Sequence, residues 1–301
     1  MRVFGGIELG GTNTTWGVAA EDLVPIASGT FATGDPAPTI DTAIAAILAA
    51  AAGTPLTTLG IGAFGPLDLG RGAILRSPKA AWSGADLRAL VRARTSAAVA
   101  IDTDVNAAAL GEQLAGAGRG AGDFIYLTVG TGIGGGAVAG GRLLHGEGHA
   151  EMGHMRVPAH ASDLEAPGFA GICPFHGDCL EGMACGPAIE ARFGAPPETL
   201  APDHPAWERE AHYLGLAIAN LVHTLRPARI IAGGGVMDAP GLRERTRRAT
   251  LAAIGSYLDV GDGSQLVLAP GLGDLAGLVG AFALARAAAQ AQHPIPEGGS
   301  T

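Results

Sequence analysis

The chain has 301 residues, of which 48% are hydrophobic and 16% charged, a composition typical of a folded protein with room for two domains. Its 28 acidic residues outnumber its 19 basic ones and give a formal charge of −9. This balance, without a run of Lys or Arg, argues against nucleic-acid binding. Lys79 is the only lysine and follows Ser77-Pro78, which excludes a Gly-Lys-Ser/Thr phosphate loop.

The sequence also argues against a membrane or secreted protein. Its longest apolar stretches, residues 43–52 and 275–285, are far shorter than the roughly 20 residues of a membrane span. The first residues lack the apolar core and cleavage site of a signal peptide. Cys173, Cys179 and Cys185 crowd into one segment, which favours a metal site over a disulfide framework. We therefore expect a cytoplasmic location.

Short apolar runs alternate with helical patterns along the chain, which is typical of an α/β fold. In the first part, strands are expected at residues 3–9, 14–20, 23–31, 58–64 and 99–101. The helices between them are expected at residues 39–52, with Thr39 as the cap, 83–94 and 106–115. Later strands are expected at residues 124–129, 137–144, 229–232 and 265–269, and helices at 205–225 and 273–290, before a frayed tail at 292–301.

A weak internal repeat links the two halves, because residues 7–19 and 127–139 both read as strand, glycine turn and strand. The first turn is Gly10-Gly11-Thr12-Asn13, and the second is Gly130-Thr131-Gly132-Ile133-Gly134-Gly135-Gly136. We expect two similar domains, residues 1–117 and 118–301, with the last helix able to pack back on the first domain.

The paired glycine turns predict a phosphate site. The second turn matches the three-glycine dinucleotide pattern, but the helix that this motif must open does not follow. Either turn alone also fits a tight hairpin with glycines at positive φ. In equivalent positions of two halves, the glycines would let backbone N–H groups approach an anion, and Thr12 and Thr131 would add hydroxyl donors. The pair therefore favours a polyphosphate bound without lysine.

A cluster of thiols and imidazoles predicts a zinc site. Cys173, His176 and Cys179 are separated by two residues each. Two thiolates and two imidazoles would complete a tetrahedral zinc site, and four protein ligands make such a site structural. The candidates for the fourth ligand are His145, His149, His154 and His160. Cys185 lies outside the spacing and is interpreted as a small buried residue.

The order and spacing of these motifs resemble the ROK family of sugar kinases. The matching segments are Glu8-Leu9-Gly10-Gly11-Thr12, residues 102–112 (Asp-Thr-Asp-Val-Asn-Ala-Ala-Ala-Leu-Gly-Glu) and residues 130–136. Glu151-Met152-Gly153-His154 and residues 173–182 are similar to the fructokinase branch. The resemblance spans nearly the whole chain. It implies a two-domain actin-like ATPase (ribonuclease H-like) fold with duplicated mixed sheets and a zinc-stapled loop, closing on ATP and a hexose.

The resemblance implies a role for each matching residue. Asp104 would be the general base that takes the proton of the sugar's primary hydroxyl, although an Asp here also fits a helix cap. The implied sugar contacts are Gly65, Pro66, Thr103, Asp104, Glu151, His154 and Glu181. The residues that the resemblance implies as contacts to ATP and Mg²⁺ are Glu8, Gly10, Gly11, Thr12, Asn13, Gly130, Thr131, Gly132, Gly134, Gly233, Gly234 and Gly235. The implied zinc ligands are His154, Cys173, His176 and Cys179.

Some of these positions depart from the family pattern or have a plain structural alternative. Glu8 stands where Asp is usual and is expected to reach magnesium through water, and Asn13 stands where Lys is usual. Thr103 replaces an Asn frequent in the glucokinases, which favours fructose. Glu181 also fits an exposed acid at a helix start, and Gly233-Gly234-Gly235 also fits helix-capping glycines.

We therefore expect an ATP- and Mg²⁺-dependent fructokinase that forms fructose 6-phosphate, with a homodimer as the family expectation. One alternative is a kinase for mannose, glucose or N-acetylglucosamine. A second is a sugar-sensing regulator of the same family, although only residues 1–6 precede the first glycine turn, where regulators carry a winged helix. A third is a sugar-binding module without catalysis.

Overall fold

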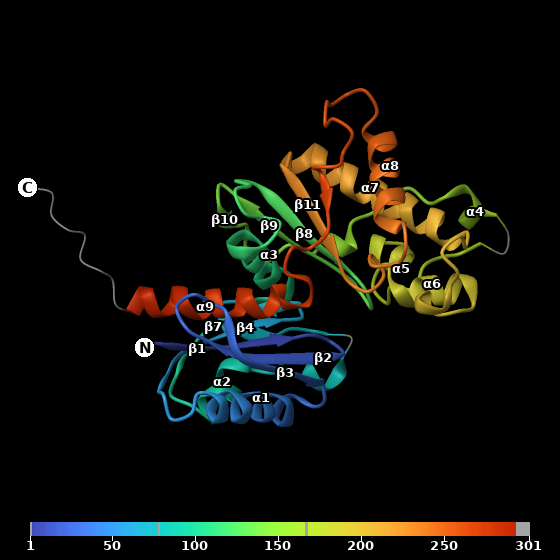
Figure 1. Cartoon of the computed structure of the whole chain (residues 1–301). Helices are drawn as coiled ribbons and strands as arrows, with labels where there is room; N and C mark the ends of the chain where they lie inside the picture. Colours follow the sequence, from blue (N-terminus) through green and yellow to red (C-terminus); the bar gives the residue numbers. More distant parts are fainter. Residues whose placement is uncertain (1, 78, 166–167, 293–301) are drawn as a thin grey trace, which may run out of the picture. The chain divides into compact units, whose positions relative to one another are not determined.

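Two five-stranded mixed sheets dominate the computed structural model, which describes residues 2–77, 79–165 and 168–292 (Figure 1). They belong to two compact units. Unit 1 consists of the described residues of Met1–Leu114, His145–His149 and Asp274–Thr301, and unit 2 of those of Ala115–Leu144 and Ala150–Gly273. The chain therefore passes from one unit to the other at four points.

The sheet of unit 1 has the order β3-β2-β1-β4-β7. Its strands are β1 (Val3–Leu9), β2 (Asn13–Ala19), β3 (Pro25–Ala32), β4 (Leu56–Ala63) and β7 (Ala98–Thr103). The first three strands pair antiparallel, whereas β1, β4 and β7 run parallel. A small hairpin, β5 (Leu67–Asp68) and β6 (Ala73–Ile74), follows β4. The segments that follow β4 and β7 therefore leave the sheet at the carboxyl ends of parallel strands.

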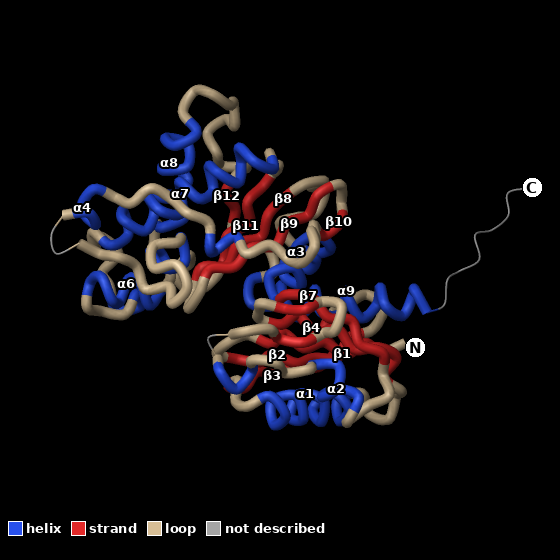
Figure 2. The backbone as a smooth tube through the Cα atoms, turned by 180° about the vertical axis from the view of Figure 1, so that it is seen from behind, coloured by secondary structure: helices blue, strands red, loops and turns tan. Residues whose placement is uncertain are grey.

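Helices cover both faces of this sheet, with α1 and α2 on one side and α9 on the other (Figures 1 and 2). The covering helices are α1 (Pro36–Ala50), α2 (Leu87–Arg92) and α9 (Ala276–Gln292). A further helix, α3 (Asp104–Ala115), follows β7. Glycines permit very close packing of α9. A Cβ on Gly60 would lie 1.8 Å from the Ala281 oxygen, and one on Gly280 would lie 1.6 Å from the Ala107 oxygen. A side chain at either position would push α9 away from β4 or α3.

The sheet of unit 2 repeats this topology in the order β10-β9-β8-β11-β12. Its strands are β8 (Phe124–Val129), β9 (Ile133–Ala139), β10 (Arg142–Leu143), β11 (Arg229–Gly233) and β12 (Val267–Leu268). The helices of this unit are α4 (Ala161–Leu164), α5 (Leu180–Ala184), α6 (Gly186–Phe193), α7 (Ala206–Leu225) and α8 (Leu242–Ile254). Ile125, Ile218 and Ile254 share a core that joins the sheet to α7 and α8. The predicted α/β fold with duplicated mixed sheets is confirmed.

Several local predictions are wrong. The first helix begins at Pro36 after Asp35, and the Thr39 hydroxyl accepts from the Gly34 N–H (3.1 Å) inside it, because proline is well suited to a first helical turn. The helix expected at residues 83–94 is only α2, which is capped by Asp86. Helix α8 was not predicted, since its buried face includes Thr246 and Thr250 and gives a weak apolar pattern. Residues 293–301 of the expected tail lie outside the described residues.

Four single-turn 3₁₀ helices complete the described secondary structure. They are η1 (Ala80–Trp82), η2 (Met152–His154), η3 (Pro197–Thr199) and η4 (Gly273–Leu275). Across the described residues, no helix combines the length and the hydropathy that crossing a bilayer requires.

Candidate functional site

The first glycine turn joins β1 to β2 and is fixed from β3. The Gly10 N–H donates to the Asn13 carbonyl (3.0 Å), which closes the turn. Thr33, just after β3, donates its N–H to the Thr12 carbonyl and its hydroxyl to the Gly10 carbonyl, both at 2.8 Å. These bonds hold the turn rigidly at the end of the hairpin.

The second glycine turn joins β8 to β9 in unit 2, in the equivalent place. Its Gly130 N–H donates to the Gly132 carbonyl (2.9 Å), and the Gly130 carbonyl accepts from Gly186 (2.8 Å). The loop after β11 lies against it, because Gly234 has φ +95° and a Cβ there would lie 2.5 Å from the Val129 oxygen. Gly233-Gly234-Gly235 therefore ends a strand next to the turn and caps no helix.

Positive φ does not explain the glycines of these turns. Gly10, Gly11, Gly130 and Gly132 all have φ outside the left-handed region. Packing requires glycine at Gly10, where a Cβ would lie 2.8 Å from the Asn13 backbone oxygen. At Gly132 a Cβ would lie 2.7 Å from Glu181 Oε2, so a side chain there would displace the Glu181 carboxylate.

Gly11 and Gly130 are less crowded. The nearest atoms to their hypothetical Cβ positions lie at 3.9 Å and 4.0 Å, so the fold itself would accept alanine at both. Glycine with room in front of its backbone suits the approach of a ligand.

The single lysine of the chain lies beside the first turn. Its Cε is the atom found 3.9 Å from the Cβ position of Gly11. Lys79 also lines a hollow of about 440 Å³ with Thr33, Gly34 and Asp35. Lys79 lies 66 positions after Asn13 in the sequence, so only the folded chain brings it to this turn.

Asp104 is the first residue of α3, directly after β7. The helix cap is the preceding residue, since the Thr103 hydroxyl accepts from the Asn106 N–H at 3.1 Å. Asp104 is half-buried, and its Oδ1 accepts from the Val105 N–H at 2.8 Å. The capping role considered for Asp104 thus belongs to Thr103, and the Asp104 carboxylate lies where the helix N-terminus favours negative charge.

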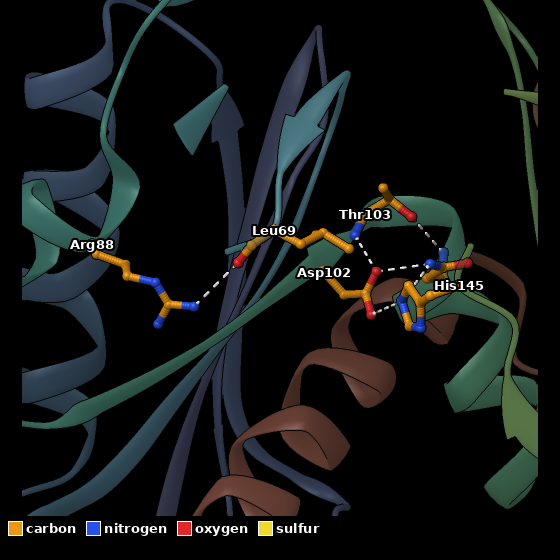
Figure 3. Close-up of polar contacts among 6 residues, drawn as sticks. Leu69, Arg88, Asp102, Thr103 and His145 are labelled. Atoms are coloured by element: carbon orange, nitrogen blue, oxygen red, sulfur yellow. Dashed lines mark hydrogen bonds and ion pairs between the residues drawn. The ribbon is translucent and has the colours of Figure 1, made fainter. Parts of the chain in front are cut away.

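The side chain of Asp102, two residues before Asp104, is buried, and the sequence alone gave it no role. Its Oδ1 accepts from the Thr103 N–H (2.8 Å) and the Asn106 side-chain amide (2.7 Å), and Oδ2 lies 2.9 Å from His145 Nε2 (Figure 3). The sequence did contain a sign of this role, because Asp102 is an acidic residue at the end of a strand, two residues before Asp104. This network fixes the β7–α3 junction.

Glu8, on β1, is half-buried and packs against α9. A Cβ on Gly277 would lie 2.3 Å from Glu8 Cδ, so only glycine fits opposite this side chain. Burial, with a smaller contribution from the negative charges of Asp104 and Asp274, raises the pKa of Glu8 to about 7. Asp274 was also missed by the sequence analysis. A divalent cation bound by carboxylates would relieve this repulsion, so the residues present fit the Mg²⁺ that the resemblance implies.

We expect Glu8→Gln to remove a pH dependence of stability. The pKa of Glu8 is about 7 in the folded chain against an ordinary 4.5, so the folded state holds the proton more tightly. Stability conferred by the neutral carboxyl is therefore lost as pH rises from about 4.5 to 7, by on the order of 3 kcal/mol. Unfolding by urea at pH 5 and pH 8, without nucleotide or Mg²⁺, should show this loss in the wild type and a smaller one in the variant. Exposed Glu21→Gln is the control, and equal pH dependence in all three proteins contradicts the prediction.

The two glutamates predicted to contact the sugar, Glu151 and Glu181, lie in unit 2 and differ in their exposure to solvent. Glu151 is exposed and precedes η2. Glu181, in the first turn of α5, is half-buried, and its Oε2 accepts from the Ile133 N–H at 2.9 Å. The alternative of an exposed acid at the start of α5 is therefore wrong. Glu181 links α5 to the second glycine turn.

The four predicted zinc ligands lie together in unit 2. Their ligand atoms are all within 4.8 Å of one another. His154 Nδ1 lies 3.4 Å from Cys179 Sγ and 3.8 Å from Cys173 Sγ, and His176 Nδ1 lies 3.6 Å from Cys173 Sγ. Sulfur and nitrogen on neighbouring corners of a tetrahedral zinc site are about 3.6 Å apart, which follows from the usual bond lengths. The residues therefore fit zinc.

The structure also separates His154 from the other histidines considered for this cluster. His145 Nε2 contacts Asp102, His149 Nε2 accepts from the Leu67 N–H (2.8 Å), and His160 accepts from Ser162 at the start of α4. Cys185 is 2% exposed, and burial raises the pKa of its thiol to about 12. It is a buried residue outside the cluster, as expected.

The predicted site residues divide between the units. Unit 1 carries Glu8, Gly10, Gly11, Thr12, Asn13, Gly65, Pro66, Thr103 and Asp104, and unit 2 carries the remainder. Unit 1 brings Glu8 and Asp104 within electrostatic reach of each other. Unit 2 brings the second glycine turn, Glu181 and the Gly233-Gly234-Gly235 loop together.

Comparison with known proteins gives consistent matches. The model of the ROK family matches residues 4–288. The fructokinase of Zymomonas mobilis subsp. mobilis is 38% identical over 296 residues, covering 95% of this chain and 97% of that protein. The fructokinase of Lactococcus lactis subsp. cremoris is 38% identical over 262 residues, covering 85% and 87%.

A solved structure extends this likeness to the fold. A ROK family glucokinase from Streptomyces griseus, in complex with glucose and AMPPNP, has a TM-score of 0.78 at 30% identity, covering 95% of this chain and 99% of that one. The duplicated sheets are thus those of the predicted actin-like ATPase fold.

Proposed function

The chain is a sugar kinase of the ROK family, and we propose that it transfers the γ-phosphoryl group of ATP to the primary hydroxyl of D-fructose. The observation that carries the proposal is the pair of equivalent glycine turns, each with one glycine at which a side chain would meet no close contact, in a fold where Asp104 begins a helix after a parallel strand. The products would be ADP and D-fructose 6-phosphate.

The nucleotide would be held by backbone groups. The turns at residues 10–13 and 130–134 offer N–H groups and the Thr12 and Thr131 hydroxyls to the phosphates, and the Gly233-Gly234-Gly235 loop lies on the adenosine side. Magnesium, when bound, neutralises charge on the phosphates. Glu8 would contribute its carboxylate to that ion through water.

Asp104 would act on the sugar. It accepts the proton as the O–H bond of the primary hydroxyl breaks, the hydroxyl oxygen forms a bond to the γ-phosphorus, and ADP leaves with the electrons of the broken P–O bond. The transition state of phosphoryl transfer is loose, so the protein mainly positions groups. The bonds that fix Thr103 and Asn106 suit this demand.

The remaining predicted residues would read the sugar hydroxyls. We assign this to Gly65, Pro66, Thr103, Glu151, His154 and Glu181. His154 directs Nδ1 at the two sulfurs, which would leave Nε2 for the sugar while zinc holds the ring. A homodimer is proposed from the family resemblance alone.

Fructose is favoured over glucose by Thr103 and by the 38% identity with two fructokinases, whereas the similar glucokinase is 30% identical. The test is ADP release from Mg²⁺-ATP with fructose, mannose, glucose and N-acetylglucosamine, in parallel. We expect kcat/KM for fructose to exceed the others by at least about tenfold, which corresponds to one well-placed polar contact. A preference for glucose would replace the substrate but keep the kinase, and inactivity on all four sugars would contradict the proposal.

A further inference from the structure

A segment that the proposed mechanism does not use connects two parts of unit 1. Residues 145–149 (His145-Gly146-Glu147-Gly148-His149), here called the histidine strap, belong to unit 1, whereas the neighbouring residues Leu144 and Ala150 belong to unit 2. The strap folds back on itself, since the Gly146 N–H donates to the Gly148 carbonyl at 2.8 Å. A histidine stands at each end, and each contacts another segment of unit 1 through Nε2.

The first anchor is His145 on Asp102. The Asp102 side chain is 7% exposed and that of His145 is 35% exposed. A carboxylate can only accept, so His145 donates through Nε2 over 2.9 Å (Figure 3). The other oxygen of Asp102 accepts from the Thr103 N–H and the Asn106 amide, so His145 completes the set of donors on a buried carboxylate. Without His145, Oδ2 of Asp102 would lose this hydrogen bond, and a buried carboxylate oxygen without a hydrogen bond destabilises the fold.

The second anchor is His149 on the loop after β4. The Leu67 N–H donates to His149 Nε2 at 2.8 Å, so this ring nitrogen carries no proton. The ring also packs against the backbone at Gly65, where a Cβ would lie 3.3 Å from His149 Cε1. His149 therefore fixes the backbone on both sides of Pro66.

We propose that the histidine strap positions the acceptor side of the site at these two points. His145 holds Asp104 indirectly, because Asp102 fixes the backbone N–H of Thr103 and the side chain of Asn106. His149 holds the loop of Gly65 and Pro66 for the sugar. The inference rests on the proposed function, which makes Asp104 the base and this loop a sugar contact. The two histidines should therefore affect different kinetic parameters.

Four variants separate the two anchors from general structural damage. His145→Leu should lower kcat about 10²-fold, as expected for a misplaced base, with KM for fructose nearly unchanged. His149→Leu should raise KM for fructose about tenfold, the value of one hydrogen bond, with kcat nearly unchanged. His145→Gln and His149→Gln should recover most of each loss, because a side-chain amide can donate or accept near the place of Nε2. The matched control is His223→Leu, at an exposed position of α7, which should keep wild-type kinetics.

Hydrogen exchange of the free protein gives a readout that does not depend on activity. His149→Leu should speed exchange at the Leu67 amide and leave that of Thr103 unchanged, and His145→Leu should do the reverse. Loss of the same kinetic parameter in both leucine variants, glutamine variants as impaired as the leucine ones, or unchanged exchange would overturn the proposal. A wild type inactive on every sugar would instead overturn the proposed function, and exchange would still decide whether the two anchors exist.

Discussion

Asp104→Asn is expected to lower kcat by about 10³-fold while leaving the affinities for fructose and ATP within a few-fold of wild type. The amide is nearly isosteric and can still accept from the Val105 N–H, so the start of α3 should be preserved. It cannot take the hydroxyl proton, which is the contribution removed. Steady-state ADP release gives kcat, and calorimetric titration gives the two affinities.

The control for this substitution is Asp22→Asn, at an exposed carboxylate of the same unit. It should turn over at the wild-type rate. An Asp104→Asn protein that is folded, binds both ligands and retains near-normal kcat would exclude Asp104 as the base. Loss of fructose affinity together with kcat would instead assign Asp104 mainly to binding.

The second large effect is expected from Cys179→Ser. Protein purified without chelator should contain about one zinc per chain, and the variant should contain almost none, because serine is a poor zinc ligand at neutral pH. Structural zinc contributes directly to folding, so a loss of about 3 kcal/mol would lower the Tm of a 301-residue chain by about 5 °C. Atomic absorption gives the zinc content, and thermal unfolding gives the Tm.

Cys185→Ser is the matched control, since Cys185 is buried and lies outside the cluster. The Cys185→Ser protein should keep its zinc, even if a serine at this buried position lowers the stability of the fold. Activity of the zinc-depleted protein should fall through KM for the sugar, because Cys179 immediately precedes α5, which carries Glu181. A wild type without zinc, or a Cys179→Ser protein with wild-type zinc content, would contradict the assignment.

The architecture was predictable because it repeats. A strand, a glycine turn and a strand recur at residues 7–19 and 127–139, and both hairpins have the same place in sheets of the same order. Local helix limits were less predictable, as at Thr39, because a cap depends on where the preceding loop turns. The candidate ligands of the metal cluster were recognisable by spacing, but spacing alone did not separate His154 from His145 or His149.

The parts of the site that escaped prediction depend on distant segments. The role of Asp102 becomes visible only when His145, 43 residues later, contacts it. The raised pKa of Glu8 arises from burial against α9 and from Asp274 at the far end of the sequence. Neither effect has a local pattern in the residues that it concerns, because both follow from tertiary packing.

The position of Lys79 has a consequence for chemical labelling of this protein. Apart from the α-amino group of the chain, Lys79 is the only amine that the sequence offers to acylating reagents. An amine-reactive dye, a crosslinker or an acetyl group would therefore modify the chain at a single internal position, next to Gly11. Attachment through lysine would place the label or the solid support at the proposed phosphate turn, whereas attachment through engineered exposed cysteines would leave that turn clear.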